Sequence, residues 1–140
     1  MASFNKFNAF VENLAEKVHN LGADTLKVLL TNTAPVATNS VKSDLTEISG
    51  GNGYTAGGVT VTVTSSAQSS GTYSLVANDP TPWTASGGSI GPFRYAVLYN
   101  DTPTSPADPL IGWWDYGSSV TLAVGETFTV DFGSSILTLA

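Results

Sequence analysis

The chain has 140 residues, which suits one domain with its own hydrophobic core. It contains no cysteine, so disulfides and thiolate chemistry are excluded. No apolar run approaches the length of a membrane span, and spaced apolar residues with early acids at Glu12 and Glu16 do not resemble a signal peptide. Only 5 residues are basic and 11 are acidic, for a net charge of −6, whereas serine and threonine together number 34. So few cations argue against a nucleic-acid partner, and a surface rich in hydroxyls favours a protein that rests against neighbours.

The segment 4–21 predicts an amphipathic helix, because its apolar residues recur at alternating intervals of three and four. These residues are Phe4, Phe7, Val11, Leu14, Val18 and Leu21. Ser3 is the expected N-cap, and Gly22 stands where the helix should stop. Packing of this face on the chain's own sheet is the favoured interpretation, and a seam between copies is the alternative. We therefore divide the chain into a helix at 1–22 and a β-rich part at 23–140.

From residue 26 onward the apolar period changes to two, which is typical of strands. The first strand is predicted around residues 26–30, followed by a loop at 33–35 and a short helical turn at 43–47. Glycines at 50–53 predict a turn that uses positive φ. A strand is expected at 59–64, where valine alternates with threonine, and residues 72–76 are its hairpin partner. The prolines at 80 and 82 confine the next segment to an edge or loop.

The second half of the chain contains the strongest strand patterns. One face is expected to carry Phe93, Tyr95, Val97 and Tyr99, and another Phe128, Val130 and Phe132. Two shorter strands are predicted at 110–114 and 120–124, separated by residues 115–117. These patterns predict a mainly β fold, an antiparallel β-sandwich or barrel-like domain with one N-terminal amphipathic α-helix.

Residues that could carry chemistry are few. His19 is the only histidine, so a multi-histidine metal site is excluded, and a structural role is favoured. Oxygen ligands gather around a proline-rich loop at Asn100, Asp101, Asp108 and Asp115, but their spacing fits ordinary turns better than a calcium loop. We therefore expect no enzymatic activity, no cofactor and no metal.

The adjacent residues Trp113 and Trp114 should point to opposite faces of a strand. One is expected in the core, and the other at an interface, under a loop or in a sugar-stacking position. Arg94 should pair with an acid such as Asp115 or Asp131. The residues expected at an interface are Trp113, Trp114, Tyr116, Phe4, Phe7 and Val11.

The chain contains the segments LTNTAP at 30–35, GNGYTAGG at 51–58, FRYAVLYND at 93–101 and PLIGWWDY at 109–116. In these segments it resembles a family of virion structural proteins of tailed bacteriophages, of the capsid decoration or cement type. The likeness runs in the same order from residue 26 to about residue 137, and the N-terminal segment resembles the family's usual start.

The resemblance implies a protein that is assembled in the host cytoplasm and located on the capsid surface of the virion. Its expected partner is the major capsid protein, with self-association as a trimer at threefold positions of the lattice. It would stabilise the head without binding nucleic acid or membrane. The alternative is a module of a tail fibre or head appendage that recognises host surface glycans.

Overall fold

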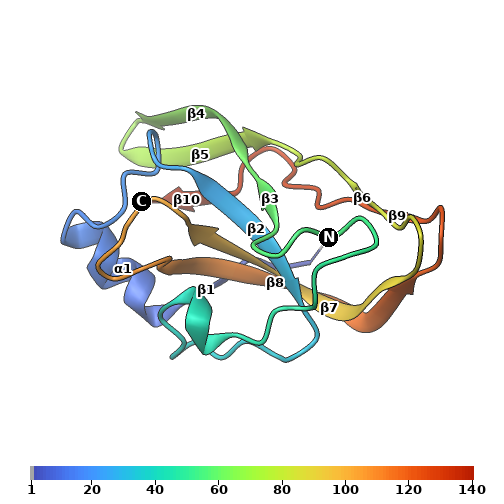
Figure 1. Cartoon of the computed structure of the whole chain (residues 1–140). Helices are drawn as coiled ribbons and strands as arrows, with labels where there is room; N and C mark the ends of the chain where they lie inside the picture. Colours follow the sequence, from blue (N-terminus) through green and yellow to red (C-terminus); the bar gives the residue numbers. More distant parts are fainter. Residues whose placement is uncertain (1) are drawn as a thin grey trace.

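A computed structural model describes residues 2–140 and has a mainly β fold with a sandwich-like arrangement of antiparallel strands (Figure 1). The elements are β1 (Asn5–Lys6), α1 (Asn8–Ala15), β2 (Leu26–Thr31), the 3₁₀ turn η1 (Lys42–Asp44), β3 (Val59–Thr60), β4 (Thr62–Ser69), β5 (Thr72–Asn78), β6 (Trp83–Thr84), β7 (Ile90–Asn100), β8 (Leu110–Leu122), β9 (Thr127–Phe128) and β10 (Leu137–Leu139). The predicted fold class is confirmed.

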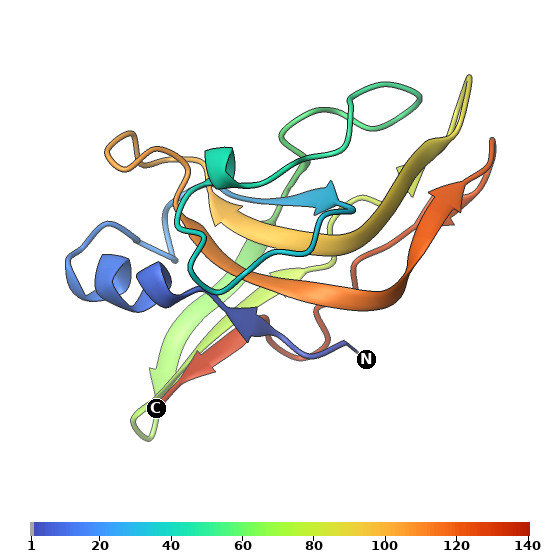
Figure 2. The same ribbon diagram turned by 90° about the horizontal axis from the view of Figure 1, so that it is seen from below.

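Three sheets form the layers of the molecule. The largest has the strand order β1-β8-β7-β2-β3, the second β10-β5-β4, and the third consists of β6 and β9. Figure 2 shows β4, β5 and β10 running across the direction of β2, β7 and β8. β4 and β5 form a hairpin, with pairs from Thr62↔Asn78 to Ser69↔Thr72. The predicted partner of residues 72–76 is corrected, because these residues pair with 65–69 and not with the strand expected at 59–64.

The main core lies on the side of the five-stranded sheet that faces the two smaller sheets. Alternate residues of β2 and β7 point into it, as the period of two predicts. Its fully buried members include Leu26, Val28, Leu30, Leu75, Leu98 and Ile111.

A second, smaller core lies on the opposite side of the same sheet. It contains Phe7, Leu29, Val97, Tyr99 and Leu110, all at most 1% exposed. Burial on both sides explains why β2 reads as an almost continuous apolar run. The predicted shared face of Phe93 with Val97 and Tyr99 is wrong, because Phe93 belongs to the main core. The pairing of β7 with β8 shifts register between Phe93 and Tyr95, which breaks the alternation.

The N-terminal helix is shorter than the predicted segment 4–21, and the division of the chain at 1–22 is corrected accordingly. Asn5 and Lys6 instead pair with β8 as the short strand β1. Phe7, not Ser3, is the N-cap, and it has an extended backbone with φ −76° and ψ 146°. The helix ends at the C-cap Glu16, well before Gly22, and Lys17 then adopts a φ of +68°.

The buried face of α1 also differs from the predicted seam. Phe10 is 1% exposed, whereas Val11 is 51% exposed. Phe7, Phe10 and Leu14 face the protein interior, again at intervals of three and four. The seam is therefore displaced from Val11 to Phe10, because the chain enters the helix from a strand and not from a preceding helical turn.

Several strand boundaries differ from the prediction. The strand expected through Phe128, Val130 and Phe132 is limited to β9, which ends at Phe128. The alternating segment 59–64 is divided at Val61, with β3 pairing with β2 and β4 pairing with β5. The two strands predicted at 110–114 and 120–124 are one strand, β8, which bulges opposite the Phe93–Tyr95 segment of β7. A bulge absorbs Gly117, with its φ of +100°, without ending the strand.

Candidate binding cleft

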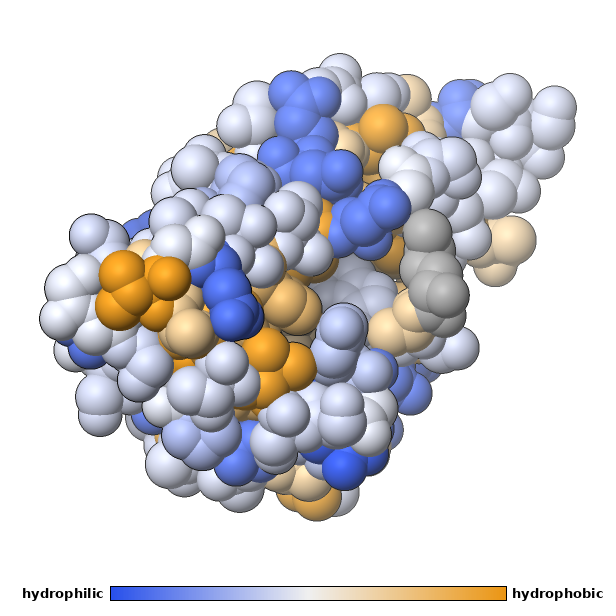
Figure 3. Space-filling model, turned by 90° about the vertical axis from the view of Figure 1, so that its right-hand side faces the viewer, coloured by the Kyte–Doolittle hydropathy of each residue, from blue (hydrophilic) through white to orange (hydrophobic). Residues whose placement is uncertain are grey.

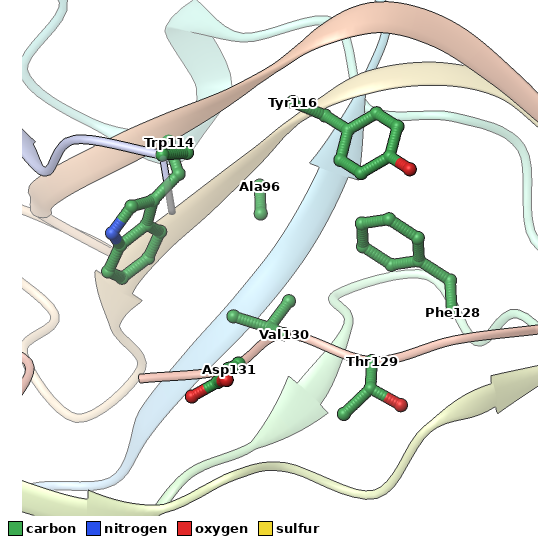
Figure 4. Close-up of a pocket in the computed structure, with 8 residues that line it drawn as sticks. Ala96, Trp114, Tyr116, Phe128, Thr129, Val130 and Asp131 are labelled. Atoms are coloured by element: carbon green, nitrogen blue, oxygen red, sulfur yellow. The ribbon is translucent and has the colours of Figure 1, made fainter. Parts of the chain in front are cut away.

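An open cleft of about 340 Å³ lies where the five-stranded sheet meets the segment that follows β9 (Figure 4). Strands β7 and β8 provide one side, and residues 128–131 provide the other. Its lining consists of Ala2, Ala96, Trp114, Tyr116, Phe128, Thr129, Val130 and Asp131.

Aromatic rings form the walls of the cleft. Figure 4 shows Trp114 on one side and Tyr116 with Phe128 on the other, with Ala96 between them. The rings of Tyr116 and Phe128 meet edge to face, with centroids 5.5 Å apart and an interplanar angle of 75°. Phe93 supports Phe128 at 4.8 Å. Trp114 and Phe128 therefore pack against the main core on the side away from the cleft. Tyr116 stays 59% exposed.

The strand pattern explains why there is space between the walls. Trp114 and Tyr116 are two residues apart on β8, so both side chains leave the same face. Ala96 on β7 is paired directly with Trp114. Because its side chain is a single methyl group, the surface dips between the larger rings.

One carboxylate belongs to the lining of the cleft, and no lysine or arginine does within residues 2–140. Asp131 accepts a hydrogen bond from the backbone N–H of Gly133 at 2.7 Å. It takes part in none of the ion pairs within the described chain. The lining thus combines aromatic faces with a negative charge that has no cationic partner in this part of the protein.

The negative charge of the nearby Asp115 carboxylate is already balanced by a cation, Arg94. Arg94 donates two hydrogen bonds to it, from Nε at 2.7 Å and from a terminal nitrogen at 2.9 Å. These bonds lower the pKa of Asp115 and raise the pKa of Arg94. The predicted pairing of Arg94 with Asp115 is confirmed, and Asp131 is not its partner.

The six predicted interface residues occupy different places. Trp114 and Tyr116 line the cleft, and Phe4 packs on Trp114 with ring centroids 5.4 Å apart. Trp113 points to the opposite face and packs on Phe7 at 4.5 Å, so the two tryptophans diverge as predicted. Phe7 is fully buried and offers no surface to a partner, whereas Val11 is exposed on α1.

Six other residues of the cleft were not among the predicted interface residues, namely Ala2, Ala96, Phe128, Thr129, Val130 and Asp131. Phe128 and Val130 were assigned to a strand face, and both do contact the main core while reaching the cleft. Ala96 and Asp131 carry no motif of their own. A short side chain within a strand of large residues was the one local signal, because it leaves a gap beside its neighbours.

The four residues considered for calcium do not converge on one point. Asn100 is fully buried beside His19, Asp101 pairs with Lys27 at 3.0 Å, and Asp115 binds Arg94. Within residues 2–140, no group of three or more histidine, aspartate and glutamate side chains is placed to hold a metal ion. The side chains of Asn100, Asp101 and Asp115 have structural partners instead.

The surface in Figure 3 mixes apolar and polar residues and is hollowed near its centre. Its orange patches are separated by pale and blue ones, so this face carries no continuous apolar area.

Neither α1 nor the 3₁₀ turn approaches the length and apolar character of a bilayer-crossing helix, and no other described residues form one. Comparisons of the chain with protein-family models, with curated proteins and with solved structures found no match.

Proposed function

We propose that this chain is a non-enzymatic virion structural protein of a tailed bacteriophage, which binds the assembled capsid as a decoration protein and stabilises the head. The observation that carries the proposal is the open cleft of Trp114, Tyr116 and Phe128 on a sparsely charged β-sandwich. Tryptophan and tyrosine are enriched where proteins bind one another, because a rigid ring covers much area at a low cost in entropy. The four sequence segments that resemble the phage family point in the same direction.

The charge distribution also suits a lattice protein. With 16 charged residues in 140, few long charged side chains would lose hydration when the surface meets a capsomer. Individual contacts of this kind are modest, but a capsid repeats them over many copies, and a trimer would tie three capsomers together. A ligand selective for the assembled shell stabilises that shell by mass action.

The first experiment removes the protein from the particle. Virions that lack the chain should assemble and package DNA but release it at a lower temperature, which a DNA-dye release assay measures. Quantitative gels should place the chain among the abundant virion proteins. Depleted particles that keep full heat resistance but fail to adsorb to cells would favour the glycan-binding appendage instead.

The second experiment connects the function to the cleft. Tyr116→Ala should fold normally, because the side chain is 59% exposed, yet should weaken attachment to depleted particles by about tenfold. Val124→Ala is the matched control, since Val124 is 65% exposed and does not line the cleft. Equal attachment of both variants would remove the cleft from the contact.

A further inference from the structure

We infer that the cleft is a binding site for an organic cation, an arginine or lysine side chain of the partner protein. The inference rests on the proposed function only for the source of that side chain, the capsid protein. The residues that line the cleft support the cation site independently of that function.

The first step is the arrangement of the rings. Trp114, Tyr116 and Phe128 surround a depression with Ala96 between the walls (Figure 4). The face of an aromatic ring carries the negative part of its quadrupole and attracts a cation placed within about 6 Å of the centroid. A cation seated over Ala96 would have aromatic walls on opposite sides.

The second step is the charge at the cleft. Asp131 belongs to the lining, and within residues 2–140 its carboxylate has one polar contact, with the N–H of Gly133. The basic side chains that form ion pairs in residues 2–140 are Lys27, Lys42 and Arg94, and they bind Asp101, Glu47 and Asp115, not Asp131. No lysine or arginine of residues 2–140 belongs to the lining, so the Asp131 carboxylate is open to an incoming cation.

Other occupants would fit the lining of the cleft less well than a cation. A neutral apolar side chain would reduce the hydration of Asp131 without supplying a partner for its charge. A sugar needs several hydrogen-bonding groups placed around its ring, whereas the polar side chains here are Asp131, Thr129 and the Tyr116 hydroxyl. An alkyl cation uses both the rings and the carboxylate, since its stem can pack on the aromatic walls.

The test uses small probes on the whole chain, with the indole N–H resonances of the three tryptophans as the readout. N-acetyl-arginine amide and N-acetyl-lysine amide are titrated separately, and N-acetyl-citrulline amide is the neutral analogue of the first. We expect the Trp114 resonance to shift saturably with one or both cations and not with citrulline. Trp83 is buried and Trp113 faces the other side of the sheet, so both serve as internal references.

A pair of charge variants tests the carboxylate. Asp131→Asn retains an oxygen that can accept the Gly133 N–H but removes the charge, and it should weaken cation binding about threefold to fivefold. Asp108→Asn changes the net charge equally, lies outside the cleft, and keeps a residue type that tolerates its φ of +49°. It should leave binding within about twofold of the unchanged protein.

Several outcomes would overturn the inference. They are equal binding of citrulline and arginine amides, no response of Trp114 to either cation, and unchanged binding in Asp131→Asn. A response of Trp114 to methyl glucoside but not to the cations would identify a sugar site instead.

Attachment to virions separates the two proposals. If the chain decorates particles and Asp131→Asn attaches as well as the unchanged protein, the cation site fails and the decoration function stands. If the probes bind as expected but the chain is scarce on virions, the cation site stands and the decoration function fails.

Discussion

The side chains of Asn100 and His19, 81 residues apart in the chain, meet in a buried hydrogen bond of 3.1 Å between Asn100 Nδ2 and His19 Nδ1. The amide nitrogen can only donate, so Nδ1 accepts and the ring proton of the neutral imidazole sits on Nε2. The same amide nitrogen donates to Asp24 Oδ2 at 2.6 Å, and Asn100 Oδ1 accepts from the N–H of Thr102 at 3.1 Å. Asn100 thereby ties the segment after α1 to the end of β7 and favours a neutral histidine.

This contact predicts a loss of stability in mild acid. Burial lowers the pKa of His19 from 6.5 to about 4, with a smaller opposing effect from Asp24. Between these two pH values the unfolded chain binds a proton that the folded chain excludes. The free energy of unfolding should therefore be highest above pH 6.5 and should fall by up to about 3 kcal/mol toward pH 4. Urea denaturation at half-unit pH steps measures it.

His19→Gln is the control for that pH dependence, because glutamine can accept a hydrogen bond from Asn100 but does not titrate. The fall between pH 6.5 and pH 4 should be clearly smaller in this variant. An identical fall in both proteins would assign the effect to other groups.

The corrected position of the helix makes a second prediction. Phe7→Ala removes a fully buried ring that packs on Trp113 and should cost about 3–5 kcal/mol. Val11→Ala, at a helical site 51% exposed, should change stability by less than about 0.5 kcal/mol. The denaturation midpoints of the two variants measure both losses of stability. Similar losses at both positions would support the longer seam through Val11.

A buried tyrosine gives the third prediction. The Tyr54 hydroxyl accepts from the N–H of Leu30 at 3.0 Å and donates to Glu47 at 2.6 Å. Burial, together with the hydrogen bond to Glu47, raises the pKa of Tyr54. Tyr54→Phe would leave both partners without this bond and should cost about 1–3 kcal/mol.

Tyr73→Phe is the matched control for Tyr54→Phe, because its hydroxyl bonds only to Ser66 near the surface, at 2.8 Å. It should cost less than about 0.5 kcal/mol in the same thermal or urea experiment. Equal losses of stability in the two variants would show that the buried Tyr54 hydroxyl stabilises the fold no more than the Tyr73 hydroxyl near the surface.

Removal of metal ions is the subject of the fourth prediction. Since Asn100, Asp101 and Asp115 bind different protein groups, a chelator should leave the melting temperature unchanged. Differential scanning calorimetry with and without the chelator measures this. A drop of many degrees would revive a calcium site in the loop after β7.

The pattern of alternate residues was sufficient to predict several strands. Leu26, Val28 and Leu30 point into the main core as their spacing indicates. Residues 72–76 do form a strand, but their partner is 65–69 and not the alternating segment 59–64. These strands could be predicted because side-chain alternation and turn chemistry are properties of neighbouring residues.

The N-terminal segment could not be assigned in the same way. Its apolar spacing satisfied a helix from residue 4, yet Asn5 pairs with Trp113 and Lys6 with Gly112 across more than 100 residues of sequence. Backbone pairing with a distant strand competes with a local helix, and the outcome depends on whether that strand has a free edge. No local pattern contains that information.

The cleft shows the same division between local and distant information. The adjacency of Trp113 and Trp114 predicts that their side chains leave opposite strand faces. The shared face of Trp114 and Tyr116 was not predicted, because residues 115–117 were expected to separate two strands and instead continue β8. Only the tertiary structure sets Phe128 against Tyr116, adds Asp131 to the lining and pairs Ala96 with Trp114. A cleft is the space left between layers, so it depends on how far the two layers stand apart and on which small residue faces the gap, and packing across the whole fold decides both.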